Sequence, residues 1–203
     1  MKLSQQVLCT IDDACQGKFD SALLHSCISI DTTSRRLLAK ENRVGVRYVQ
    51  CLRDYYWLIE PMIGAGLNLV ETKFTNIQLR KNSAPDLAEI IYEILRCSHA
   101  HGDEVPPEFS ILPSPDPGYT RWELSKGQIH MPARIVWALL SVAVFSRVNA
   151  TEESDYTHYL SLGDQVFPIS QWWGREDEVR PIAAAFNQTR IKMDGLERLG
   201  APV

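Results

Sequence analysis

Apolar side chains recur at helical spacing between residues 87 and 95, and this is the strongest periodic pattern in the chain. The positions i, i+3, i+4, i+7 and i+8 are Leu87, Ile90, Ile91, Ile94 and Leu95. The preceding Ser83-Ala-Pro85-Asp86 is typical of a helix start, and Gly102 is a stop signal. The pattern predicts an amphipathic helix whose apolar face must be buried against other elements.

Similar patterns predict further helices on both sides of this one. We expect helices near residues 3–15, over residues 23–38 as one long helix or a broken pair, at 46–63, from Pro132 through Val148, and at 176–193. Gly17 separates the first two. A chain of 203 residues with 45% hydrophobic residues can bury one substantial core without metal or disulfide support. The sequence therefore predicts a mostly α single domain over residues 1–203.

A short β element interrupts the helices. Five prolines between residues 105 and 118 exclude helix there and favour an extended surface loop. Alternating apolar residues on either side of Lys126-Gly127 predict a hairpin at about 119–131. Residues 150–203 are expected to be a C-terminal extension, irregular at 167–174.

Composition excludes several classes of function. The formal net charge is -4, with 21 basic and 25 acidic residues, so a broad basic field for nucleic acid is not expected. Five cysteines without a CxxC pair predict neither a disulfide framework nor a zinc cluster, and packed, reduced thiols are expected. Nucleotide-binding glycine loops and the GxSxG motif are absent from the sequence. No cofactor is therefore expected.

The expected location is the cytoplasm. The first residues, Met1-Lys-Leu-Ser-Gln-Gln, lead into a mixed polar segment rather than the apolar stretch of a secretory signal. The longest apolar run, 135–148, is shorter than the ~20 residues that a bilayer span needs and includes Arg147. We interpret this run as a buried core helix and expect no membrane association.

The motif that carries a chemical hypothesis lies at the end of the 87–101 pattern. It reads Glu93-Ile-Leu-Arg96-Cys-Ser-His99-Ala-His101-Gly, with Arg96 and His101 five positions apart. Placed after an amphipathic helix and two or three earlier helices, it resembles the higher eukaryotes and prokaryotes nucleotide-binding (HEPN) family. The resemblance covers about residues 18–148, which would form a HEPN-like helical bundle carrying the hairpin as an insertion. The second position of the family pattern is Cys97, where many members have Asn, Asp or His.

This resemblance implies a metal-independent endoribonuclease. In the family's ribonucleases two subunits share a site, so a homodimer with Arg96 and His101 at the scissile phosphate is implied. A defence or toxin–antitoxin setting, with a cognate antitoxin as partner, is implied in the same way. An alternative from a different class is a non-catalytic HEPN-like bundle that binds a nucleotide, RNA or a protein partner.

The residue types suit this chemistry. Metal-free RNA cleavage needs a base for the 2'-hydroxyl proton, an acid for the 5'-oxygen and a cation for the phosphorane charge. Histidine exchanges protons near neutral pH, and the planar fork of arginine matches phosphate oxygens. His99 is a candidate second proton carrier, and Glu93 is placed to orient the Arg96 guanidinium.

Simpler interpretations stay open. The i, i+3 spacing of Glu93 and Arg96 also suits an ordinary surface ion pair, and a capping or buried His101 ring is the alternative to a catalytic one. On a regular helix, Arg96 and His101 lie about 140° apart, so convergence requires local unwinding or a second copy. The His99-Ala-His101 spacing and nearby acidic residues are insufficient for a metal site. His130 in the hairpin is another candidate proton carrier, and the Trp122, Trp172 and Trp173 rings are expected to pack rather than bind ligand.

Overall fold

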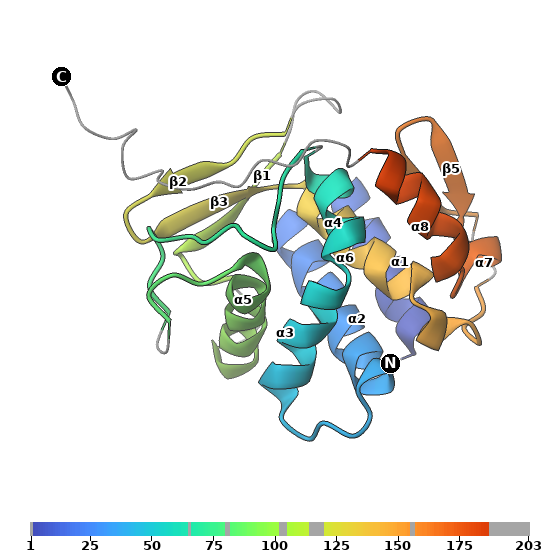
Figure 1. The fold of residues 1–203 in the computed structure, drawn as a ribbon, viewed down its shortest axis with the longest axis horizontal. Coiled ribbons are helices and arrows are strands. Elements are labelled where there is room, and N and C mark those ends of the chain that lie inside the picture. The colour runs from blue at the N-terminus through green and yellow to red at the C-terminus, as the bar shows by residue number, and fades with distance from the viewer. Residues whose placement is uncertain are drawn as a thin grey trace.

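The fold is mostly helical, as the sequence predicts (Figure 1). The computed structural model describes residues 2–64, 66–79, 82–101, 105–113, 120–154 and 157–186, the side chains of residues 96–101 excepted. Its α-helices are α1 (Leu3–Cys15), α2 (Phe19–Leu37), α3 (Val44–Asp54), α4 (Tyr56–Ile63), α5 (Leu87–His101), α6 (Arg134–Phe145), α7 (Ile169–Trp172) and α8 (Glu176–Ala185). Its strands are β1 (Phe109–Leu112), β2 (Glu123–Ser125), β3 (Gln128–Pro132), β4 (Tyr159–Leu162) and β5 (Gln165–Pro168).

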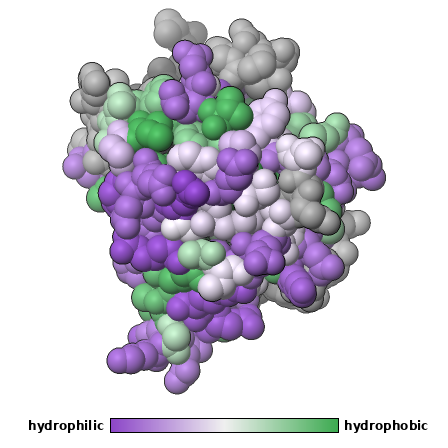
Figure 2. Space-filling view, turned by 90° about the vertical axis from the view of Figure 1, so that its right-hand side faces the viewer, coloured by the Kyte–Doolittle hydropathy of each residue, from purple (hydrophilic) through white to green (hydrophobic). Residues whose placement is uncertain are grey.

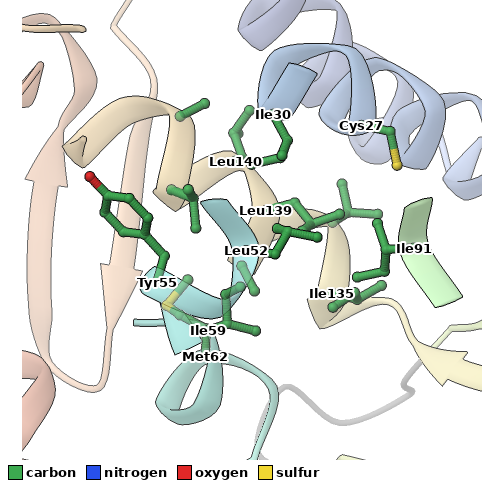
Figure 3. Packing of buried hydrophobic residues seen from close by; sticks show 14 of the residues in the cluster. Cys27, Ile30, Leu52, Tyr55, Ile59, Met62, Ile91, Ile135, Leu139 and Leu140 are labelled. Carbon is green, nitrogen blue, oxygen red and sulfur yellow. The ribbon is translucent and has the colours of Figure 1, made fainter. Parts of the chain in front are cut away.

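The core lies where α2, α3, α4, α5 and α6 meet. Helix α2 packs against α1, α3, α5 and α6, and α4 packs against α6. Figure 3 shows side chains from these helices pointing into one cluster, among them Ile30, Leu52, Ile91 and Leu139. The cluster extends from Leu3 in α1 to Ala183 in α8, so the first and last described helices both contribute to it.

The helix predicted at 46–63 is two helices, which corrects the sequence interpretation. Tyr55 separates α3 from α4 with backbone angles of φ −107° and ψ 11°. The two helices have different neighbours, because α3 packs on α2 and α5 whereas α4 packs on α6 and α8. A single straight helix cannot pack against both sets of neighbours. The periodicity of apolar residues does not indicate where a helix must break to reach different neighbours.

The sheet contains one strand that the sequence analysis missed. The expected hairpin is present as β2 and β3, with Gly127 at φ +79° in its turn. The segment expected to be only a proline-rich loop also supplies β1, which pairs parallel to β3 in a sheet of order β1-β3-β2. Phe109, Ile129 and Met131 are buried and attach the sheet to the core. Strand β1 is only four residues long and lies among prolines, so it shows no clear alternation of apolar residues. Its partner β3 lies about twenty positions later, so no nearby residue indicates the pairing.

The apolar helix expected from Pro132 through Val148 is shorter at both ends. Pro132 is the last residue of β3, and α6 runs from Arg134 to Phe145 before a 3₁₀ turn at Arg147–Asn149. Asn149 is fully buried, and its side-chain amide donates to the Ala143 carbonyl oxygen at 2.8 Å and to the Thr33 hydroxyl at 2.9 Å. This contact satisfies a carbonyl near the end of α6 and joins it to α2.

The C-terminal region is more regular than expected. Residues 159–168 form the antiparallel β4–β5 pair, and the supposedly irregular 167–174 segment contains the end of β5 and all of α7. The final helix begins at Glu176 as predicted but ends at Ala185, with Phe186 as its C-cap, and residues 187–193 of the predicted range lie outside the described residues. Figure 2 views the side that carries these elements and shows a largely hydrophilic surface with smaller hydrophobic areas. Among the described helices, none has the length and apolar character needed to cross a membrane.

Glu176 forms a buried polar cluster at the start of α8. Its carboxylate accepts hydrogen bonds from the Tyr55 hydroxyl at 2.6 Å, from Arg180 at 2.9 Å and from Arg147 at 3.3 Å. Burial acts to raise the pKa of Glu176, but the hydrogen bonds from Arg147, Tyr55 and Arg180 outweigh it and lower the pKa to about 2. The charged carboxylate therefore links α8 to the α3–α4 junction and to the end of α6.

Gly174 should be far less tolerant of a side chain than Gly17. Both have positive φ, +73° and +75°, so alanine strains the backbone equally at the two positions. A Cβ on Gly174 would lie 2.4 Å from the Ala150 Cβ, whereas Gly17 has no neighbour within 4 Å. We expect Gly174→Ala to lower the free energy of unfolding by about 3 kcal/mol and Gly17→Ala by about 1 kcal/mol. Equal losses in urea titrations would contradict the close approach of Gly174 to Ala150.

Removing the Glu176 charge should destabilise the fold in a pH-dependent way. We expect Glu176→Gln to cost about 2 to 3 kcal/mol above pH 5, since several hydrogen bonds to a buried charge weaken. The pKa is lowered in the folded state, so this stabilisation is complete above about pH 4.5 and disappears as the pH falls towards 2. Urea titrations at several pH values measure it. Glu178→Gln, in an exposed pair with Arg175, is the control and should change stability by less than about 0.5 kcal/mol.

Candidate functional site

Helix α5, which carries the predicted catalytic motif, is firmly held at its N-terminal end. The backbone N–H of Glu89 donates to the Asp86 carboxylate and the N–H of Asp86 donates to the Glu89 carboxylate, each at 3.0 Å. This reciprocal capping uses Asp86, whereas the sequence start signal suggested Ser83 as the cap. The N–H of Ala88 donates to the Tyr56 hydroxyl at 2.9 Å. The first turn of α5 is thus held by its own capping residues and by Tyr56 of α4.

The apolar stripe of α5 is buried as predicted. Its members are Leu87, Ile90, Ile91, Ile94 and Leu95, all at most 3% exposed. The helix packs against α2 and α3 through this stripe. Burial of this stripe fixes the orientation of α5 in the bundle, and it also fixes where the helical turn after Leu95 begins.

The predicted catalytic residues occupy the last two turns of α5. The backbone stays helical through His101, so the local unwinding that would bring Arg96 and His101 together in one chain is not observed. In a regular helix, positions five residues apart lie about 140° apart around the axis, so the observed backbone alone does not bring positions 96 and 101 together. The side chains of Arg96, His99 and His101 lie outside the described part of the structure, and so does Cys97. Glu93 is partly exposed one turn before Arg96.

A pocket of about 470 Å³ opens beside the other end of α5. It lies between α3, α4, the 66–79 segment and the start of α5. It is lined by Val70 and by six residues with polar or charged groups, Gln50, Arg53, Asp54, Tyr56, Lys73 and Asp86. The sequence analysis did not find it, because its residues come from three separate segments between Gln50 and Asp86 and share no motif.

Asp86 organises the charges of this pocket. Its carboxylate lies 2.7 Å from an Arg53 guanidinium nitrogen and 3.3 Å from the Lys73 ammonium nitrogen, while Arg53 also reaches Glu89 at 3.3 Å. The Asp86 side chain is 5% exposed, but those of Arg53 and Lys73 are 38% and 44% exposed. Burial raises the pKa of Tyr56, so its hydroxyl stays protonated at neutral pH. The pocket thus offers a polar ligand two partly exposed cations that already share the Asp86 carboxylate.

A second cluster lies on the three-stranded sheet. Register places Ser110 beside His130 on one side and Glu123 beside His130 on the other, so all three side chains project from one face. The Ser110 hydroxyl is hydrogen-bonded to His130 Nδ1, and Glu123 forms an ion pair with Arg121 at 2.5 Å. The sequence analysis named His130 as a proton carrier but missed Ser110, because the parallel pairing of β1 was not foreseen.

The four cysteines whose side chains the structure describes form no disulfide with one another. Cys27 and Cys51 are buried, and burial raises the pKa of each thiol to about 12, so neither is reactive at neutral pH. Cys9 is partly exposed and Cys15 is exposed. The expectation that the cysteine thiols are packed therefore holds for Cys27 and Cys51 but not for Cys15. Among the described residues, no three His, Cys, Asp or Glu side chains are grouped closely enough to hold a metal ion.

Trp122 and Trp172 pack against other aromatic rings, and Trp173 is buried. Trp122 stacks on Phe74, and Trp172 meets Phe145 and Phe167 edge to face. Trp173 is buried and donates its Nε1–H to the Ser154 hydroxyl at 3.1 Å. These contacts confirm the packing interpretation of the three tryptophans.

Comparison with known proteins identifies relatives without an assigned activity. The model of the Rv1289 family matches residues 2–198. Uncharacterized protein Rv1289 of Mycobacterium tuberculosis strain H37Rv is 32% identical over 179 residues, covering 87% of this chain and 85% of the relative. Uncharacterized protein Mb1320 of Mycobacterium bovis matches with the same identity and coverage. No solved structure matches the chain significantly.

Two substitutions at Asp86 should separate its two roles. Asp86→Asn keeps a capping oxygen but removes the charge, and we expect a loss of about 1 kcal/mol in the free energy of unfolding. Asp86→Ala also removes the cap and leaves Arg53 and Lys73 without their shared partner, so the loss should reach about 2 to 3 kcal/mol. Asp54→Asn, in the same pocket, is the control and should stay within about 0.5 kcal/mol. Identical losses for Asp86→Asn and Asp86→Ala in urea titrations would rule out the capping role.

Proposed function

The chain belongs to the Rv1289 family, and we propose that it is a metal-independent endoribonuclease in which Arg96 and His101 act in a site shared by two copies of the chain. The observation that supports this proposal is the position of the Arg-x4-His motif. It ends a helix that is capped at its start and anchored by a buried apolar stripe. A catalytic group on such a helix needs little reorganisation before it acts.

The proposed reaction is a transesterification, in which the ribose 2'-oxygen replaces the 5'-oxygen on phosphorus and the 5'-hydroxyl product is released. His101 takes the proton of the ribose 2'-hydroxyl, whose oxygen forms a bond to phosphorus while the bond to the 5'-oxygen breaks. His99 returns a proton to the departing 5'-oxygen, which leaves as a hydroxyl. Arg96 donates hydrogen bonds to the phosphate oxygens as negative charge accumulates on them, and Glu93 orients the guanidinium.

Helix geometry makes a homodimer part of the proposal. Because α5 continues through His101, positions 96 and 101 of one copy lie about 140° apart around its axis. One copy therefore does not direct both groups at the same phosphate. A two-fold arrangement of two α5 C-terminal ends brings Arg96 of one copy near His101 of the other. The HEPN-like resemblance supports this arrangement and suggests an antitoxin as a further partner in a toxin–antitoxin or defence setting.

The Asp86 pocket favours a second candidate, a non-catalytic helical bundle that binds a nucleotide or RNA. Lys73 and Arg53 are partly exposed cations beside the start of α5, and Tyr56 lines the same pocket. Phosphate oxygens can accept hydrogen bonds from both cations. In this case the ligand contacts the N-terminal end of α5, and Arg96 and His101 have no part in binding.

One experiment distinguishes the two candidates. Wild type should cleave a fluorescently labelled single-stranded RNA in the presence of EDTA, and Arg96→Ala and His101→Ala should each lower the rate by about 100-fold or more. Light scattering should give the mass of two chains. Arg43→Ala and His25→Ala, which alter residues of the same types elsewhere, should retain the wild-type rate.

Other outcomes are equally informative. Equal rates in wild type and in both motif variants would eliminate the proposed catalytic pair. RNA or nucleotide binding without cleavage, weakened by Lys73→Ala but not by Arg96→Ala, would establish the binding protein instead.

A further inference from the structure

We infer that Ser110 and His130 form a second reactive site, a nucleophile and its general base, that transfers acyl groups from small carboxylic esters to water. This inference does not depend on Arg96 or His101. It rests on the sheet, whose strands β1 and β3 bring the two side chains together from positions twenty residues apart.

The two side chains are in direct contact on the face of the sheet that points away from the core. Parallel register pairs Ser110 with His130, and the Ser110 hydroxyl is hydrogen-bonded to His130 Nδ1. Their sheet neighbours on the opposite face, Phe109, Ile129 and Met131, are buried. Ser110 and His130 are themselves partly exposed, so an ester can reach the hydroxyl from solvent.

The strands hold the pair in a reactive geometry. His130 lies on the central strand β3, with β1 on one side and β2 on the other, so its backbone is held from both sides. The hairpin turn next to it is fixed by Asn76, whose amide donates to the carbonyl oxygens of Ser125 and Gln128 at 2.9 and 3.0 Å. A hydroxyl held against an imidazole is the arrangement that activates serine as a nucleophile.

The backbone beside Ser110 supplies a donor for the developing negative charge. Ile129 N donates to the Glu108 carbonyl oxygen, and Ala133 N donates to the Leu112 carbonyl oxygen, each at 2.9 Å. Even-numbered residues of β1 therefore bond to β3, and the N–H of Ile111 points to the outer edge of β1. This N–H belongs to the residue after the nucleophile, the position that contributes to many oxyanion holes.

The reaction balances with water as the second substrate. The Ser110 oxygen forms a bond to the ester carbonyl carbon while His130 takes the hydroxyl proton. The bond from that carbon to the alcohol oxygen then breaks, and the alcohol leaves with the proton from His130. Water, deprotonated by His130, attacks the acyl-serine and releases the carboxylic acid. Ser110 regains its proton.

The test uses 4-nitrophenyl acetate and phenylmethanesulfonyl fluoride with the full chain. Wild type should hydrolyse the ester above the buffer rate, and the sulfonyl fluoride should modify Ser110, with loss of fluoride, as located by mass spectrometry. Ser110→Ala and His130→Gln should each lower the ester rate by about 100-fold or more and abolish the modification. Circular dichroism melting confirms that the variants are folded.

Two variants serve as controls. Ser125→Ala removes an exposed hydroxyl from the same sheet and should leave rate and modification unchanged. Arg96→Ala should also leave them unchanged, which separates this site from the proposed ribonuclease. Hydrolysis no faster than in buffer, modification of another residue instead of Ser110, or equal ester rates in wild type and folded Ser110→Ala would each overturn the inference.

Discussion

The architecture depends on burying a helix that has no polar face. Helix α6 has ten buried residues among its twelve, and only Arg134 and Trp137 are partly exposed. A helix that is apolar all round must be enclosed by other elements. Helices α1, α2, α4 and α7 all pack against it, so segments from both ends of the chain are brought to the same centre. Its polar exceptions are satisfied locally, since the Ser141 hydroxyl donates to the Ala138 carbonyl oxygen.

Where the elements that enclose α6 meet, some polar groups are buried. Specific side chains form hydrogen bonds with these buried groups. Asn149 joins the end of α6 to α2, and Glu176 joins α8 to the α3–α4 junction. Such groups cost free energy unless each donor or acceptor finds a partner. These buried polar groups therefore specify which elements pack together, whereas apolar contacts alone would permit other arrangements of the helices.

The Asp86 pocket and the Arg-x4-His motif, the two regions for which a function is proposed, lie at opposite ends of helix α5. Its first turn is capped by Asp86 and borders the Asp86 pocket, and its last turns carry the Arg-x4-His motif. The buried stripe holds the helix against α2 and α3, so both ends have determined positions in the bundle. The Ser110–His130 contact on the sheet, in contrast, depends on strand pairing and not on α5.

Local chemistry in the sequence determined the mostly helical class, the buried stripe of α5, the β2–β3 hairpin and the breaks at Gly17 and Gly127. Each of these follows from residues close together in the chain, where spacing and backbone conformation act directly. Only the tertiary structure decided the division at Tyr55, the end of α6 at Phe145, the parallel pairing of β1, and the groupings of Arg53 with Asp86 and of Ser110 with His130. Those features depend on which distant surfaces meet, and the free energy of such contacts is not encoded in any one segment.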